Sequence, residues 1–153
     1  MTTISTGKVL LSLSSFWSAY GCYHFDWNET HIYNPQWPPH AKFHNAQTMS
    51  TGAVVGAAGL YLLWGRRGAW TRDRLQLTAA AASVYWITQL SAIFYPGTAL
   101  FDHPQHPSAS GAVTAAAGPP KVLGPQTVVA SVALAINVLA YGLEIRRLAR
   151  NPA

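Results

Sequence analysis

The chain has 153 residues, the length of one domain; half of its residues are apolar and only 10% are Asp, Glu, Lys or Arg. Because a soluble domain usually carries about a quarter charged residues, this composition favours an integral membrane protein. The net charge of +5 would indicate nucleic-acid binding if the basic residues formed a stripe. They instead lie in clusters between long apolar stretches, so we expect a single membrane domain over residues 1–153 and no nucleic-acid partner.

Four apolar stretches are each near the ~20 residues that a helix needs to cross a ~30 Å hydrocarbon layer. The sequence therefore predicts an all-α fold, a bundle of four transmembrane helices. A soluble bundle would carry charged outer faces, which these stretches lack. The predicted spans are about 9–25, 43–64, 75–95 and 126–145.

Three glycines in the second predicted span, Gly52, Gly56 and Gly59, recur on nearly one helical face. Small residues at this spacing let helices approach closely in lipid. The sequence leaves open whether they pack within the bundle or join subunits of a homo-oligomer.

The basic residues predict an orientation, because cytoplasmic loops carry an excess of Lys and Arg. Eight fall at the N-terminus, in the second loop and at the C-terminus, which share one side of a four-span protein: Lys8, Arg66, Arg67, Arg72, Arg74, Arg146, Arg147 and Arg150. Only Lys42 and Lys121 fall on the other side. We therefore expect a multi-pass protein whose N- and C-termini are both cytoplasmic. All six histidines then share the opposite face: His24, His31, His40, His44, His103 and His106.

The first loop, within the run from Asp26 to Gln47, combines acids, imidazoles and amides with aromatic residues that suit a membrane interface. Polar chemistry at the edge of a lipid phase is costly to keep without a use. The Pro38-Pro39 pair forces extended backbone and suits a helix start. A helix that begins there carries His40, His44 and Gln47 on one stripe.

We interpret this loop as a site of acid/base chemistry. A carboxylate partly buried at the end of an apolar bundle has a raised pKa, and a carboxylate partner tunes a histidine. Such pairs transfer protons on lipophilic substrates without a cofactor. The catalytic candidates are Asp26, Glu29, His40, His44 and, from the third loop, Asp102. The substrate-binding candidates are Trp27, His31, Asn34, Trp37, Gln47 and Gln89.

The expected function is isomerisation, cyclisation or cofactor-independent oxygenation of an isoprenoid, polyketide or quinone in a biosynthetic pathway. One alternative is a metal-dependent oxidoreductase or hydrolase, because His40 and His44 are spaced to share a Zn, Fe or Cu ion. The remaining ligands would come from Asp26, Glu29, His31, Asp102, His103 or His106. Another alternative is a non-catalytic membrane subunit or assembly factor. A structural interpretation also stays open, in which the polar residues hold the first loop together and Asp26 or Asn28 caps a turn.

Three polar residues deep in the spans, Gln89, Asn137 and Tyr141, more often make interhelical hydrogen bonds than catalytic contacts. Glu144 and Arg147 are spaced as an i, i+3 surface pair.

The segment from Asn34 to His44, Asn-Pro-Gln-Trp-Pro-Pro-His-Ala-Lys-Phe-His, resembles a family of small four-helix membrane proteins with the signature N-P-x-W-P-P-H-x-[RK]-F-H. In size and layout the chain also looks like the DoxX-like and anthrone-oxygenase-like four-helix membrane proteins. Some of those proteins act on aromatic polyketides or quinones. The second resemblance implies a type of substrate and no residue roles.

Overall fold

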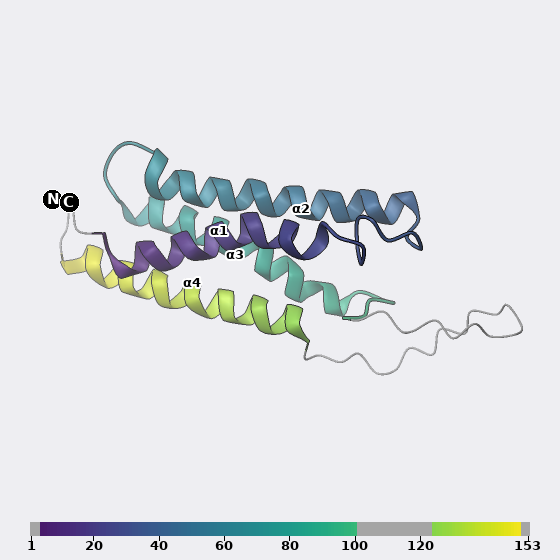
Figure 1. Ribbon diagram of the computed structural model, residues 1–153. Helices are drawn as coiled ribbons and strands as arrows, with labels where there is room; N and C mark the ends of the chain where they lie inside the picture. The colour runs from purple at the N-terminus through teal and green to yellow at the C-terminus, as the bar shows by residue number, and fades with distance from the viewer. Residues whose placement is uncertain (1–3, 101–123, 151–153) are drawn as a thin grey trace, which may run out of the picture.

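The computed structural model describes residues 4–100 and 124–150, which form an all-helical fold with no strand among them (Figure 1). The all-α fold class is therefore confirmed. Two short turns, a π-helix and a 3-10 helix, extend the second and third of four long helices. The elements are α1 (Thr6–Asp26), α2 (Pro39–Leu60), η1 (Tyr61–Gly65), α3 (Arg72–Ser91), η2 (Ala92–Phe94) and α4 (Pro125–Arg150).

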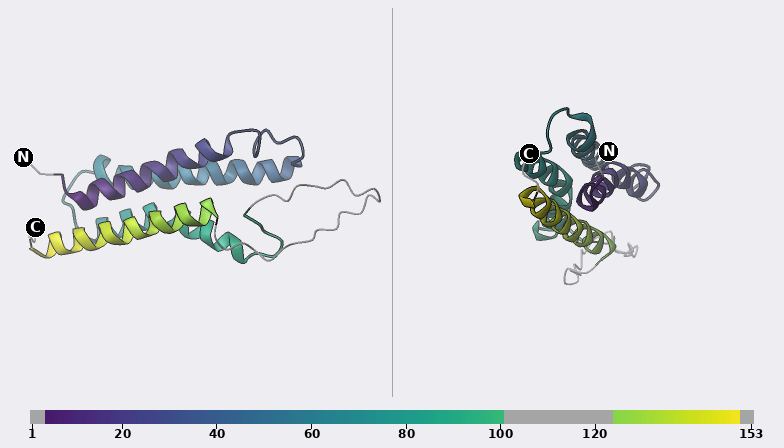
Figure 2. Two further views of the ribbon diagram at one scale, coloured as in Figure 1. Left: turned by 60° about the horizontal axis from the view of Figure 1, so that its bottom comes forward. Right: turned by 90° about the vertical axis from the view of Figure 1, so that its left-hand side faces the viewer.

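The four helices pack side by side, and each runs antiparallel to the one before it (Figures 1 and 2). The start of α1, the end of α4 and the α2–α3 connection lie at one end of the bundle, which we call the terminal end. The α1–α2 loop, residues 27–38, lies at the other end, which we call the loop end, together with the end of α3 and the start of α4. The prediction that the first and third loops share one end is confirmed for their described parts.

The helix starts follow local signals in the sequence. Ser5 caps α1 by accepting a hydrogen bond from the Lys8 backbone N–H, and Thr71 caps α3 in the same way toward Arg74. Pro39 is the first residue of α2, as the Pro-Pro pair predicted. The pyrrolidine ring fixes a helical φ, and the missing N–H is not needed at that position.

The interior of the bundle combines small polar side chains with a few large apolar ones, while many other large apolar side chains point outward. Ser15, Ser18 and Thr78 are fully buried, whereas Val54 is 67% and Val138 is 73% exposed. Leu11, Met49, Leu63, Leu75 and Trp86 are buried as well, so the unusual feature is the number of large apolar side chains that remain exposed.

Asn137 of α4 is buried and reaches across to α3. Its amide donates to the Ala82 carbonyl at 2.9 Å and to the Ser83 hydroxyl at 3.1 Å. The predicted interhelical hydrogen bond of Asn137 is confirmed.

Of the four predicted spans, two are long and apolar enough to cross a membrane: Arg72–Phe94 and Pro125–Arg150. α1 and α2 match their predicted positions but do not meet this measure, because α1 is rich in serine and the first two turns of α2 are polar. By this measure, residues 4–100 and 124–150 contain two candidate spans rather than four.

The glycines of α2 face α1 of the same chain. A Cβ at Gly52 would lie 2.7 Å from the Cys22 sulfur, and one at Gly56 would lie 2.7 Å from the Ala19 Cβ. Gly59 abuts Ser15 in the same way. Because α1 covers this face, a homo-oligomer would have to form through another surface.

We predict that Gly56→Ala destabilises the fold, because the added methyl group overlaps the α1 backbone. Overpacking of this kind typically costs about 1–3 kcal/mol, which lowers the melting temperature of a chain of this size by roughly 2–12 °C. Thermal unfolding of the detergent-purified protein measures the effect.

Gly142→Ala is the matched control, since a Cβ at Gly142 would meet no atom within 4 Å. Alanine also favours a helix over glycine, so this variant should melt at or above the wild-type temperature. Equal melting temperatures for the two variants would contradict the proposed contact between α1 and α2.

Candidate functional site

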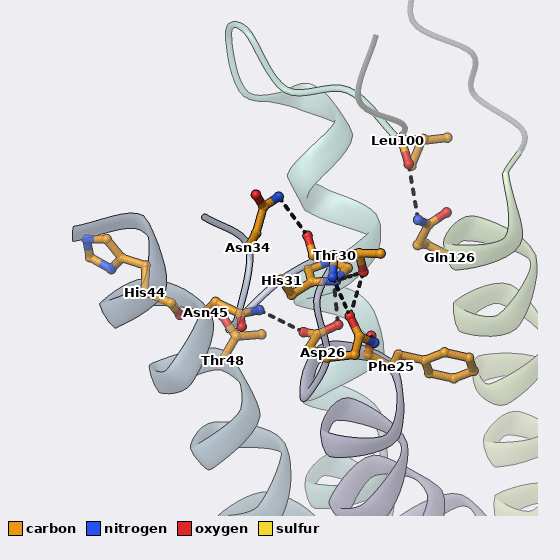
Figure 3. Close-up of polar contacts among 11 residues, drawn as sticks. Phe25, Asp26, Thr30, His31, Asn34, His44, Asn45, Thr48, Leu100 and Gln126 are labelled. Atoms are coloured by element: carbon orange, nitrogen blue, oxygen red, sulfur yellow. Dashed lines mark hydrogen bonds and ion pairs between the residues drawn. The ribbon is translucent and has the colours of Figure 1, made fainter. Parts of the chain in front are cut away.

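The loop end is organised around Asp26, the last residue of α1 (Figure 3). Its Oδ2 accepts a hydrogen bond from the Asn45 amide of α2 at 3.0 Å, and its Oδ1 lies 3.8 Å from Nε2 of His31. The Asp26 side chain is 20% exposed and that of His31 is 36% exposed. Three segments, the end of α1, the loop and α2, thus meet at one carboxylate.

A turn built on Asn28 places His31 beside this carboxylate. The Asn28 side-chain oxygen accepts from the Thr30 backbone N–H at 2.9 Å and from the Thr30 hydroxyl at 2.6 Å, the side-chain turn that asparagine favours. The Thr30 oxygen lies 2.7 Å from Nδ1 of His31, which leaves Nε2 directed toward Asp26.

A second turn, built on Asn34, supports the first. The Asn34 amide donates to the Thr30 carbonyl at 3.2 Å, and its side-chain oxygen accepts from the Gln36 N–H at 2.9 Å. The Trp37 ring meets the His31 ring edge to face, with centroids 5.3 Å apart. Asn34 and Trp37, both predicted to bind substrate, thus brace the loop around His31.

Burial raises the pKa of the Asp26 carboxyl above its usual value of 3.8, while the charge of His31 and the Asn45 hydrogen bond oppose the rise. The net upward shift means that Asp26 keeps its proton to a higher pH than an exposed aspartate does.

The structure does not bring Asp26 or Glu29 together with His40 or His44. Glu29 is exposed and has no polar contact among the described residues. His44 points away from Asp26 on another face of α2 (Figure 3). The imidazole that faces Asp26 is His31, which the sequence analysis placed among the substrate-binding residues.

The predicted stripe on α2 does form. Nε2 of His40 and Nε2 of His44 lie 3.1 Å apart, and Nδ1 of His44 lies 3.3 Å from the Gln47 side-chain oxygen. All three side chains are exposed. In residues 4–100 and 124–150, no group of three or more His, Cys, Asp or Glu side chains could hold a metal ion.

The other predicted site residues lie apart from Asp26 or outside the described part of the chain. Trp27 is exposed and packs edge to face on Tyr33. Gln89 is half-buried in α3, and its side chain makes no hydrogen bond to another described residue. Near the start of α4, the Gln126 amide donates to the Leu100 carbonyl at 3.1 Å (Figure 3). Asp102, His103, His106 and Lys121 lie outside the described residues.

Thr30 and Asn45 take part in the site but were not predicted from the sequence, and Glu144 does not lie at its predicted surface position. The Asn28-x-Thr30 pattern is a local turn signal, but no local pattern pairs Asn45 with Asp26. Glu144 was expected on the surface and is instead 1% exposed. Its carboxylate accepts from the Trp70 indole N–H at 2.8 Å and lies 3.3 Å from Arg147, so the prediction of a surface pair is wrong for Glu144.

A family model matches residues 10–153, nearly the whole chain; its description is a family of unknown function (DUF6640). The search of curated proteins and the search of solved structures each found no match.

We predict that Asp26→Asn changes how thermal stability depends on pH. Because the folded pKa of Asp26 lies above 3.8, the contribution of Asp26 to the stability of the wild-type protein falls as the pH rises from 3.8 through the folded pKa. Asparagine cannot ionise, so the melting temperature of the variant relative to wild type should rise between about pH 4 and pH 7. Melting curves at a series of pH values measure this difference.

Asp73→Asn, at an exposed position in the first turn of α3, controls for the removal of one carboxylate. A difference between Asp26→Asn and wild type that stays flat over this pH range would contradict the buried environment of Asp26.

Proposed function

We propose that this chain, which belongs to the DUF6640 family of unknown function, is a four-span membrane enzyme that transfers protons on a lipophilic small molecule at Asp26 and His31. The observation that carries the proposal is a partly buried carboxylate, held by Asn45 and faced by His31, at the end of an apolar bundle. The terminal end would face the cytoplasm and the loop end the opposite side.

The outward-facing side chains support four spans. A protein in water rarely exposes a contiguous apolar patch larger than a few hundred Å², whereas in lipid large side chains face outward and small ones pack between helices. At ~1.5 Å per residue, the 21 residues of α1 and 22 of α2 are each long enough to cross a ~30 Å layer. Large exposed apolar side chains occur on every helix: Leu13, Phe16, Val54, Leu77, Ile87, Val132, Val138 and Leu139.

Aromatic side chains gather near both ends of the bundle, which supports the same arrangement because Trp and Tyr are enriched at membrane interfaces. The exposed ones near the loop end are Phe25, Trp27, Tyr33, Phe43, Phe94 and Tyr95, and those near the terminal end are Tyr61 and Trp64. The described basic residues lie at the terminal end except Lys42, and this asymmetry supports a cytoplasmic location for both termini.

The contacts of Asp26 support a role in proton transfer. The Asn45 amide donates a hydrogen bond to Oδ2 of Asp26. The 3.8 Å between Oδ1 of Asp26 and Nε2 of His31 is too long for a direct hydrogen bond. Oδ1 and Nε2 of His31 are therefore each free to bond to a substrate atom. In the proposed reaction Asp26 removes a proton from carbon beside a carbonyl group, and His31 returns one at another atom.

The surroundings of Asp26 favour a lipophilic substrate. Trp27 and Tyr33 expose their rings near it, and α1 presents a lipid-facing surface directly below it. Quinones, aromatic polyketides and isoprenoids carry the carbonyl groups or double bonds that isomerisation, cyclisation or carbanion oxygenation requires.

We predict that the purified protein, reconstituted in liposomes with a cellular lipid extract in deuterated water, introduces deuterium into a carbon position of a lipophilic compound. Removing a general acid or base typically costs 10²- to 10⁴-fold in rate. Asp26→Asn and His31→Ala should each slow exchange by about that factor, measured by mass spectrometry of the extract.

Asp73→Asn, at the opposite end of the bundle, should exchange at the wild-type rate. Exchange that is unaffected by Asp26→Asn and His31→Ala in folded protein would contradict the assignment.

A metal site is a second candidate function, favoured by the separation of the His40 and His44 nitrogens. Two imidazoles bound to a tetrahedral zinc ion at about 2.0–2.1 Å lie roughly 3.3 Å apart, close to the 3.1 Å observed. If this candidate holds, protein purified without chelator contains one equivalent of metal, and His40→Ala/His44→Ala removes it. Elemental analysis decides, and metal-free protein with full exchange activity would reject the candidate.

A further inference from the structure

The structure divides the basic residues of the terminal end into an internal set and a free set. Arg74 belongs to the internal set: it is 6% exposed and donates hydrogen bonds to the backbone carbonyls of Leu62, Leu63, Gly68 and Ala69. These bonds fix the α2–α3 connection against α3. The charge of Arg74 is therefore directed into the fold.

Arg147 and Lys8 are only partly buried, but their contacts also lie within the fold. Arg147 pairs with the buried Glu144, and Lys8 lies with its ammonium group 4.3 Å from the centre of the Trp70 ring. Trp70 also donates to Glu144, so these four side chains join the start of α1, the α2–α3 connection and the end of α4.

The other five arginines are exposed, and none has an ion pair with another described residue. They are Arg66, Arg67, Arg72, Arg146 and Arg150. Of the acids at this end, Glu144 is buried and paired, which leaves Asp73 as the exposed carboxylate among the described residues. The exposed surface of the terminal end is thus strongly positive.

This positive surface borders the apolar sides of the helices. Tyr61 and Trp64, which precede the α2–α3 connection, are 61% and 50% exposed. A lipid headgroup lies where an apolar surface gives way to a charged one. Guanidinium groups bind phosphate oxygens with two parallel hydrogen bonds.

We propose that Arg66, Arg67, Arg72, Arg146 and Arg150 bind the phosphate groups of anionic phospholipids in the membrane leaflet at the terminal end. The inference rests on the proposed membrane-spanning arrangement and adds a lipid partner to it. The free arginines select the lipid, while Arg74, Arg147 and Lys8 hold the terminal end together.

The test uses the full chain reconstituted in vesicles of equal parts phosphatidylcholine and phosphatidylglycerol, then extracted in mild detergent. Mass spectrometry measures the ratio of the two lipids that stay bound. Wild type should be enriched in phosphatidylglycerol, by about fivefold for each basic residue that engages a headgroup. Replacing all five free arginines by glutamine should return the ratio to that of the vesicle and leave the melting temperature unchanged.

Two control variants separate the two sets of residues. Arg74→Gln should lower the melting temperature and keep the lipid enrichment. Lysine at Arg66, Arg67 and Arg72 keeps the net charge but loses the two-pronged geometry, so we expect weaker enrichment at equal orientation in the vesicle. Equal lipid ratios for wild type and the five-glutamine variant would overturn the proposal.

Vesicles of phosphatidylcholine alone separate this inference from the proposed function. Protein that floats with these vesicles and resists carbonate extraction, yet shows no lipid preference in mixed vesicles, overturns only the lipid inference. Protein that remains in the aqueous fraction overturns both the four-span arrangement and the lipid partner.

Discussion

The close contact between α1 and α2 determines where the functional groups at the loop end lie. Gly52 and Gly56 lack the Cβ atoms that would push α1 away, so the helix backbones come close enough for the Cys22 thiol to donate to the Met49 carbonyl at 3.2 Å. One helical turn further along both helices, the same register places Asp26 opposite Asn45. The carboxylate is therefore partly buried and hydrogen bonded because glycines several turns away let the helices approach.

Local signals in the sequence were sufficient for the helices and for one side-chain stripe. The Pro-Pro pair set the start of α2, and helical spacing then placed His40, His44 and Gln47 together. The contact between Asp26 and Asn45 joins residues 19 positions apart and depends on the α1–α2 register, which no local pattern encodes. The contact between Asp26 and His31 depends on the two turns that Asn28 and Asn34 build within the loop.

Glu144, at the terminal end, is another residue whose surroundings no local sequence pattern encodes. An i, i+3 pair with Arg147 can form at the surface or in the interior. Residues distant in the sequence determine which of the two positions Glu144 takes. Gly7 of α1 leaves room for the Glu144 side chain, and Trp70 of the α2–α3 connection donates to it. A buried carboxylate needs such partners, because an unpaired charge in the interior is strongly unfavourable.

The acid/base candidate, at the end of α1 and in the loop, and the metal candidate, on α2, meet different faces of α2. Asn45 and His44 are neighbours in sequence, and successive side chains of an α-helix diverge by about 100°. Since Asn45 faces Asp26, His44 is directed elsewhere, as Figure 3 shows. The contacts of Asp26 and His31 therefore do not depend on whether His40 and His44 bind a metal ion. The two candidate sites can be altered separately by mutation.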